Sequence, residues 1–180
     1  MKATRLLAAM VLGTAIGASQ ANAQCSGNAG SCNTTNTASV TVGTLVKLGM
    51  TSTTTALTNP SADQVDAGLP LDNAGPSFTI KANRSWTLKI KASPAVAGFW
   101  DYVGSNSGLK PITDLAWATS AGGSYSAITA SDANFTSGAS ASNGAAAQAF
   151  FRTSWTNDFT SASNAPGTYS LPIVFTLTAP

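Results

Sequence analysis

The 180-residue chain has no histidine, and all seven of its acidic residues are aspartate. Enzymes most often move protons near neutral pH with His or Glu, so the usual acid–base catalysts are missing. Aspartates could still supply a carboxylate pair for glycoside hydrolysis, and a serine could pair with a lysine as a nucleophile. Because nothing in the sequence singles out such a pair, we expect a protein that is not an enzyme and uses no cofactor.

Charge is also scarce, since charged residues make up only 9% of the chain. Two of the nine basic residues, Lys2 and Arg5, lie at the extreme N-terminus. If that end is removed, seven basic residues balance seven aspartates and the net charge is zero. A neutral chain has no basic surface with which to hold a phosphate backbone or an anionic membrane. We therefore expect no nucleic-acid partner.

The first 23 residues, "MKATRLLAAMVLGTAIGASQANA", have the layout of a secretory signal peptide. A basic start is followed by the apolar run Leu6–Ala18 and by the A-x-A cleavage site Ala21–Ala23. The apolar run is shorter than the roughly 20 residues that span a bilayer, which argues against a transmembrane anchor. A lipid anchor at Cys25 is a second alternative. The pattern predicts an exported mature chain that begins at Gln24, has no membrane span, and is periplasmic, extracellular or at the cell surface.

Cys25 and Cys32 are the only cysteines. In an exported protein such a pair most simply forms a disulfide, here closing the short loop "CSGNAGSC". An intermolecular disulfide is the main alternative, whereas a metal site would lack histidine ligands. We predict the disulfide within a flexible N-terminal segment, residues 24–37.

Beyond that segment, apolar and polar residues alternate with period 2, and turn-forming residues separate the runs. The clearest hairpin is "PSFTIKANRSWTLKIKAS", with Asn83-Arg84 at its turn. Further strands are expected in "TASVTVGTLVKLGM", "DLAWATS", "GGSYSAITA" and "QAFFRTSW". Two stretches, Thr51–Gly75 and Ser131–Gln148, suggest long connections, the second with a possible short strand around Phe135. We predict one all-β domain over residues 38–180, an antiparallel immunoglobulin-like β-sandwich of seven or eight strands, with a closed barrel as the nearest alternative.

The last strand is expected over Tyr169–Leu177, where every second residue is apolar. Pro172 falls on the polar face and has no N–H for a ladder, which places this strand at an edge or opposite a bulge. Proline also blunts an edge against uncontrolled pairing. We expect the strand to complete its own sandwich. If any strand is donated to a neighbouring subunit, Cys25–Thr37 is the better candidate.

Aromatic residues supply one candidate binding site. Phe99, Trp100 and Tyr102 cluster in the loop "AGFWDYVGSNSG", where exposed rings could stack on a glycan or another ligand. The alternative is that this loop folds back over the core. The other three tryptophans are in phase with the apolar faces of expected strands and are predicted to be core residues: Trp86, Trp117 and Trp155.

Asp63, Asp66 and Asp72 crowd one connection and form a weak Ca²⁺ candidate, because Ca²⁺ takes several oxygen ligands from flexible loops. Their spacing is not that of an EF-hand, and no Glu is present as a bidentate ligand. The alternative, which we favour, is that these aspartates cap turns. No metal is expected.

The signal peptide, the N-terminal cysteine pair, the "DLAWATS…GSYSAIT" hairpin and the ending "PGTYSLPIVFTLTAP" resemble features of small secreted bacterial immunoglobulin-like sandwiches. The ending is similar to that of spore coat protein U-like and chaperone–usher pilin-like subunits. The eight-residue cysteine loop and Pro172 depart from their pattern. The resemblance implies a structural or adhesive protein of the cell surface whose partners are itself or other surface subunits. A secreted carbohydrate- or ligand-binding module is the alternative.

Overall fold

The computed structural model describes residues 33–180, and a compact unit begins at Val42. Residues 33–41 contain no helix or strand and are exposed. The signal peptide over residues 1–23, its cleavage site and the Cys25–Cys32 pair lie outside the described residues. Those three features therefore stay predictions.

The compact unit is an antiparallel β-sandwich of ten strands, two or three more than expected. The first sheet has the order β1-β2-β8-β5-β6, formed by Val46–Met50, Leu71–Ala82, Ser142–Thr153, Leu115–Ala118 and Ser126–Ala127. The second has the order β10-β3-β7, formed by Ile173–Thr178, Trp86–Ala92 and Ala133–Gly138. A separate ribbon pairs β4, Asp101–Gly104, with β9, Gly167–Ser170. The helical turns are α1, Ala62–Asp66, and two 3₁₀ turns, Ile112–Asp114 and Ala162–Asn164.

Both strands of the predicted hairpin and the turn at Asn83 are confirmed as β2 and β3, but the hairpin itself is wrong, because β2 lies in the first sheet and β3 in the second, and they do not pair with each other. Along β3 every second side chain is buried, from Trp86 to Ala92, and the alternate lysines are half-buried. This is the pattern that a sheet with one face on the core requires. Strand β2 is longer than expected because it begins at Leu71, before Pro76. The register between β2 and β8 shifts between Ala74 and Ser77, and this shift accommodates Pro76, which has no N–H.

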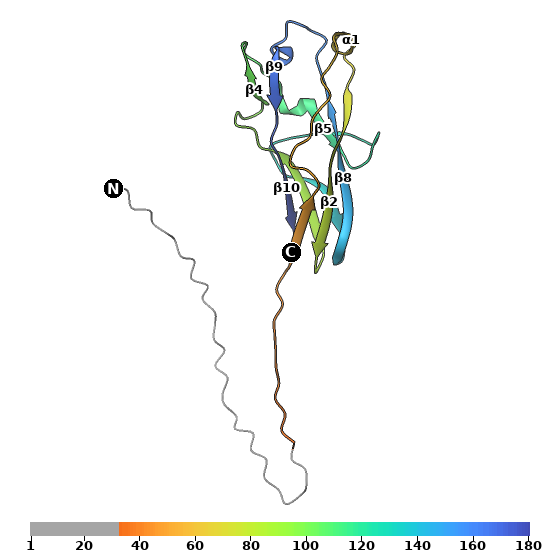
Figure 1. Cartoon of the computed structure of the whole chain (residues 1–180), viewed down its shortest axis with the longest axis vertical. Helices are drawn as coiled ribbons and strands as arrows, with labels where there is room; N and C mark the ends of the chain where they lie inside the picture. Colours follow the sequence, from red (N-terminus) through yellow and green to blue (C-terminus); the bar gives the residue numbers. More distant parts are fainter. Residues whose placement is uncertain (1–32) are drawn as a thin grey trace, which may run out of the picture. The chain divides into compact units, whose positions relative to one another are not determined.

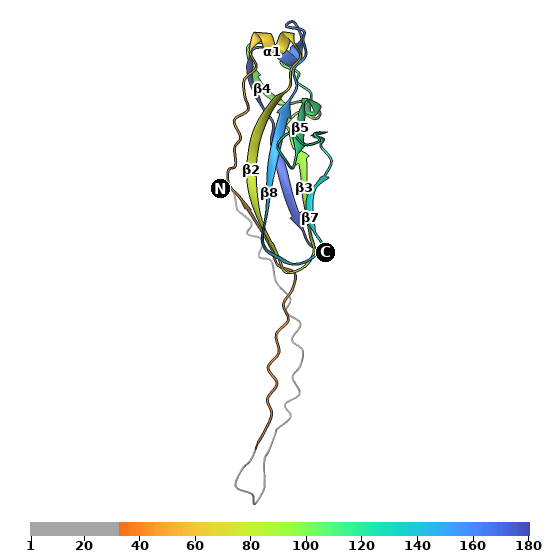
Figure 2. The ribbon, with the colours of Figure 1, turned by 90° about the vertical axis from the view of Figure 1, so that its right-hand side faces the viewer.

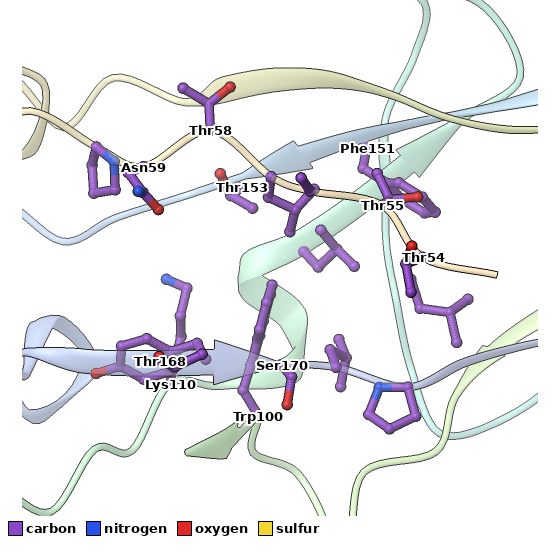
Figure 3. A pocket seen from close by; sticks show the side chains of 18 of the residues that line it. Thr54, Thr55, Thr58, Asn59, Trp100, Lys110, Phe151, Thr153, Thr168 and Ser170 are labelled. Atoms are coloured by element: carbon purple, nitrogen blue, oxygen red, sulfur yellow. The ribbon is translucent and has the colours of Figure 1, made fainter. Parts of the chain in front are cut away.

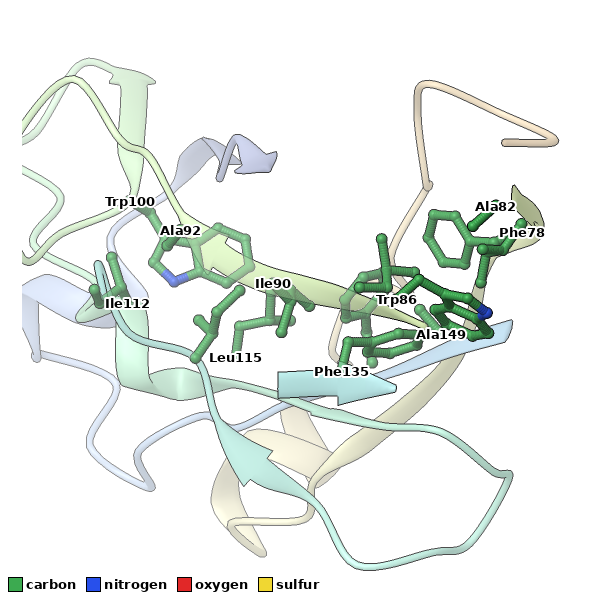
Figure 4. Close-up of a cluster of buried hydrophobic side chains, with 14 residues drawn as sticks. Phe78, Ala82, Trp86, Ile90, Ala92, Trp100, Ile112, Leu115, Phe135 and Ala149 are labelled. Carbon is green, nitrogen blue, oxygen red and sulfur yellow. The ribbon is translucent and has the colours of Figure 1, made fainter. Parts of the chain in front are cut away.

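Phe135 lies at the centre of the core, between the two sheets (Figure 4). Its ring centroid is 5.7 Å from that of Phe78, 5.6 Å from that of Phe175 and 5.5 Å from that of Trp117. The expectation of a long loop over Ser131–Gln148 is wrong, and the alternative of a short strand around Phe135 is confirmed as β7. Small residues here serve close packing: a Cβ on Gly138 would lie 2.5 Å from the Trp86 ring.

The C-terminal strand is divided at Leu171-Pro172. Before the break β9 pairs with β4, and after it β10 pairs with β3. The alternation of Ile173, Phe175 and Leu177 toward the core is confirmed, as is the edge position of the strand. Within the compact unit, β4, β9 and α1 lie at one end and the C-terminus at the other (Figures 1 and 2).

The predicted N-terminal strand is shorter than expected. Only Val46–Met50 forms β1, while Val40 and Val42 belong to no strand. They retain exposed fractions of 88% and 67%. The expectation of a strand at Val40 and Val42 is therefore wrong for the described residues, where both lie outside the sheets.

Candidate functional site

The compact unit contains a groove of about 940 Å³. One wall is the segment that follows β1, with Thr54, Thr55, Thr58 and Asn59 (Figure 3). The opposite wall is formed by β9 and the start of β10, and Phe151 and Thr153 of β8 lie between the walls. The groove therefore follows the line along which the two layers of the sandwich separate.

The edge of β10 that faces away from β3 carries unpaired backbone groups. Among the strands of residues 33–180, only β3 is hydrogen-bonded to β10, although β1 also contacts it. The Ser93 N–H donates to Pro172 O over 2.8 Å, so by antiparallel alternation Val174, Thr176 and Thr178 exchange hydrogen bonds with β3. The N–H and C=O groups of the intervening residues point to the free edge: Ile173, Phe175 and Leu177.

The same three residues carry the apolar side chains of β10, and each is only half-buried although it packs on the core. The Phe175 ring lies 4.5 Å from the Phe78 ring, so it belongs to the central aromatic cluster. At a fully covered sandwich edge such residues would be buried on all sides, as their counterparts Leu88 and Ile90 on β3 are. The core is therefore incompletely covered along β10.

A buried cation lies at the other end of the groove. Lys110 has no exposed surface, and its ammonium lies 2.9 Å from Asp114 Oδ2 and 2.5 Å from Ser154 O. The ammonium is also 3.9 Å from the centroid of the Trp155 ring. Burial lowers the pKa of Lys110, and the adjacent Asp114 carboxylate opposes this shift. Because the ammonium is fully engaged within the chain, we assign Lys110 a structural role.

The sequence alone did not single out Lys110. The i,i+4 spacing of Lys110 and Asp114 was the available signal. Outside a helix this spacing does not predict an ion pair. It also cannot predict the contacts with Ser154 and Trp155, which come from a distant part of the chain.

The three aspartates of the Ca²⁺ candidate do not come together. Asp63 and Asp66 are exposed on α1, where Ser61 and Gln64 form a capping box. Asp72, on β2, accepts two hydrogen bonds from the Arg152 guanidinium, at 2.6 and 2.8 Å. Within residues 33–180 there is no group of three potential metal ligands.

The Asp72–Arg152 pair predicts a pH effect. Hydrogen bonding to Arg152 lowers the pKa of Asp72 below its ordinary value of 3.8. The pair therefore stabilises the fold above about pH 4, and this contribution is lost as the pH falls through the lowered pKa. We expect Asp72→Asn to unfold at lower urea concentration than the wild type at pH 7. The difference should shrink below pH 4, and a constant difference down to pH 2 would contradict this assignment.

The Phe99–Trp100–Tyr102 cluster does not form an open platform. Trp100 is 4% exposed and its Nε1–H donates to Pro111 O over 2.9 Å. Tyr102 is half-buried, and its hydroxyl donates to Pro166 O over 2.7 Å. The loop folds back over the core, so these rings lack the shared exposed face that stacking on a sugar needs. Of the three predicted core tryptophans, Trp86 is buried, and Trp117 and Trp155 are half-buried.

One further segment stands out by its exposure. We call residues 33–44 the donor segment. Ala38, Val40 and Val42 would share one face of it in extended form, with Ser39 and Thr41 on the other. Val40 and Val42 are the large apolar side chains on the first face, with exposed fractions of 88% and 67%.

No known family matches this chain, and no curated protein matches its sequence. Within residues 33–180, none of the helices is long and apolar enough to cross a membrane.

Proposed function

We propose that the chain is a non-enzymatic, exported structural subunit of the bacterial cell surface that assembles with copies of itself. In this proposal the donor segment of one copy pairs with β10 of the next and fills its groove. The observation that carries the proposal is the free edge of β10 lying over a partly uncovered core. An added strand would satisfy the backbone groups of Ile173, Phe175 and Leu177 and would cover their side chains in one step.

The donor segment has the length and pattern that this edge needs. Successive residues of a strand are about 3.3 Å apart, so Ala38–Val42 matches Ile173–Leu177 in length, and the groove itself is lined by Ile173 and Phe175 of this strand. Its inward face would place small and β-branched apolar side chains over Phe175, and its outward face would be Ser and Thr. Backbone hydrogen bonds would supply affinity, and the alternating side chains would set the register.

A second copy is favoured as the partner because each chain carries one donor segment and one acceptor edge. Such head-to-tail pairing does not close on itself unless the geometry forms a ring, so it can build a filament or a coat. The balanced charge of the residues after the signal peptide removes long-range repulsion between copies. The resemblance to coat and pilin-like subunits also favours a second copy as the partner.

This proposal changes two expectations. Pro172 precedes β10, so it does not blunt the edge over Ile173–Thr178, and the C-terminal strand can recruit a partner. The candidate donor also moves from Cys25–Thr37 to residues 33–44, because the apolar alternation lies there.

We expect Val40→Asp to abolish assembly of the mature chain. A carboxylate at this position would be buried without a partner in the groove of the next copy. Thr41→Asp is the matched control, because its side chain falls on the outward face and should leave assembly intact. Size-exclusion chromatography with light scattering measures both variants. Since Val40 is 88% exposed, neither change should alter the unfolding midpoint of the monomer.

The proposal fails if Val40→Asp and Thr41→Asp assemble equally. It also fails if the wild-type mature chain stays monomeric at all concentrations and binds no donor-segment peptide.

A further inference from the structure

The groove lies beyond the point where two edge strands run together. Strands β1 and β10 are edges of the two different sheets, and they contact each other without being hydrogen-bonded. Met50, the last residue of β1, lines the groove together with Phe175 of β10. After β1 the chain continues as one wall of the groove, residues 52–60, which contain no helix or strand. We call residues 52–60 the wall segment.

Strand β2 holds the wall segment through one side chain. Asn73 Oδ1 accepts a hydrogen bond from the Thr58 main-chain N–H and another from the Thr58 hydroxyl, each 2.8 Å long. Asn73 Nδ2 donates to Leu71 O over 3.2 Å, and this bond fixes the orientation of the carboxamide. Leu57 is half-buried and packs against the core. The wall segment is therefore attached to the acceptor sandwich at Leu57 and Thr58.

The backbone of the wall segment also presents unpaired groups. Thr55 and Leu57 are half-buried whereas Ala56 and Thr58 are exposed, which is the period of an extended chain. In such a chain the N–H groups of successive residues point to opposite sides. Because the Thr58 N–H points to β2, those of Thr55 and Leu57 point away from β2, toward the groove. In the part of the chain that the structure describes, neither of these two N–H groups has a main-chain partner.

We propose that the donor segment of a second copy pairs along both of its edges, with β10 on one side and with the wall segment on the other. This inference rests on the proposed function and adds a second acceptor edge to it. The inserted strand would join the two sheets of the acceptor where β1 no longer does, and the wall segment would become the continuation of β1. Every backbone N–H within Ala38–Val42 would then have a partner in the neighbouring copy, rather than every second one.

The side chains of the groove fit a donor segment in this position. Phe151, between the two walls, is buried and apolar, while both walls carry exposed hydroxyl side chains (Figure 3): Thr54 and Thr58 on one, Thr168 and Ser170 on the other. The donor segment has the same two characters, with Val40 and Val42 on one face and Ser39 and Thr41 on the other. A second copy of this chain therefore matches both the apolar base of the groove and its hydroxyl-bearing walls.

The test uses N-methylation of the donor-segment peptide, which removes one backbone N–H at a time and leaves every side chain in place. The acceptor is the full mature chain with Val40→Asp, whose own donor segment cannot fill a groove. Isothermal titration calorimetry measures the dissociation constants of peptides methylated singly at Ser39, Val40 or Thr41. Because one hydrogen bond is worth roughly 2- to 10-fold in an equilibrium constant, we expect each of the three methylations to weaken binding by at least that factor.

The pattern of losses separates this inference from the proposed function. If methylation weakens binding at Ser39 and Thr41 but not at Val40, or at Val40 alone, only one edge pairs, and the proposed function stands without the second edge. If the unmethylated peptide does not bind, or no methylation weakens binding, strand addition itself fails and the second edge fails with it.

Amide exchange of the acceptor gives a second readout, which follows the wall segment directly. The amides of Thr55 and Leu57 should exchange rapidly in the free acceptor and become protected when the unmethylated peptide binds. The Thr58 amide should be protected in both states because it already donates to Asn73 Oδ1. Unchanged exchange at Thr55 and Leu57 with saturating peptide would overturn the second edge.

Discussion

A peptide with the sequence of residues 33–44 will raise the thermal unfolding midpoint of a chain that begins at Val42 by roughly 5 to 10 °C. A ligand that binds only the folded state at 100 times its dissociation constant stabilises by about 2.7 kcal/mol. For a domain of this size each kcal/mol is worth roughly 2 to 4 °C. The effect is large because the peptide would both complete a ladder and cover the apolar side chains of β10.

The control is the same peptide with aspartate in place of Val40 and Val42, which should leave the midpoint unchanged. Differential scanning fluorimetry over a range of peptide concentrations measures both. An equal shift with the two peptides, or no shift at saturating concentration, would contradict the pairing of the donor segment with this groove.

The second large effect concerns the buried cation. We expect Asp114→Ala to lower the free energy of unfolding by about 3 to 5 kcal/mol, because it leaves the Lys110 ammonium, which has no exposed surface, without its counter-ion. Lys110→Met should cost far less, about 1 to 2 kcal/mol, because an apolar side chain of similar volume replaces the ion and Asp114 is partly solvated. Urea unfolding at pH 7 measures both variants.

The pKa of Lys110 adds a check on this pair. Burial already lowers that pKa below its ordinary value of 10.5, and removal of Asp114 removes the group that opposes the shift. In Asp114→Ala the folded state should therefore lose the proton more easily, so the penalty should shrink as the pH rises above neutrality. A Lys110→Met variant less stable than Asp114→Ala would contradict the assignment.

Strands β2 and β3 and the turn between them could be predicted from the sequence because that information is local, whereas their placement in different sheets could not. Residues alternate without interruption on both sides of Asn83-Arg84, and both strands pack one face on the core. Strand β7 was harder to predict because it lies in a run of Ala, Ser and Gly. One large residue, Phe135, holds it in place, and its partners come from three distant strands.

The groove could not be predicted either, because its walls come from segments that are distant in the sequence. The alternation over Tyr169–Leu177 shows that one face is buried, but it cannot show that β9 joins β4 while β10 joins β3. Nor does it reveal which edge remains free. Likewise the alternation of Val40 and Val42 predicts a strand, and only the structure shows that β1 begins later, at Val46. In both cases the sequence shows an apolar alternation, but it does not show which strand, if any, the segment pairs with.

The central claim is that β10 accepts a strand along its free edge, and amide hydrogen exchange tests it most directly. We would follow the chain that begins at Val42 by NMR, with and without the donor-segment peptide. The amides of Ile173, Phe175 and Leu177 should exchange rapidly alone and become protected on binding. Those of Val174, Thr176 and Thr178 should be protected in both states because they already bond to β3. Peptide binding that leaves the first three amides unprotected would contradict the account.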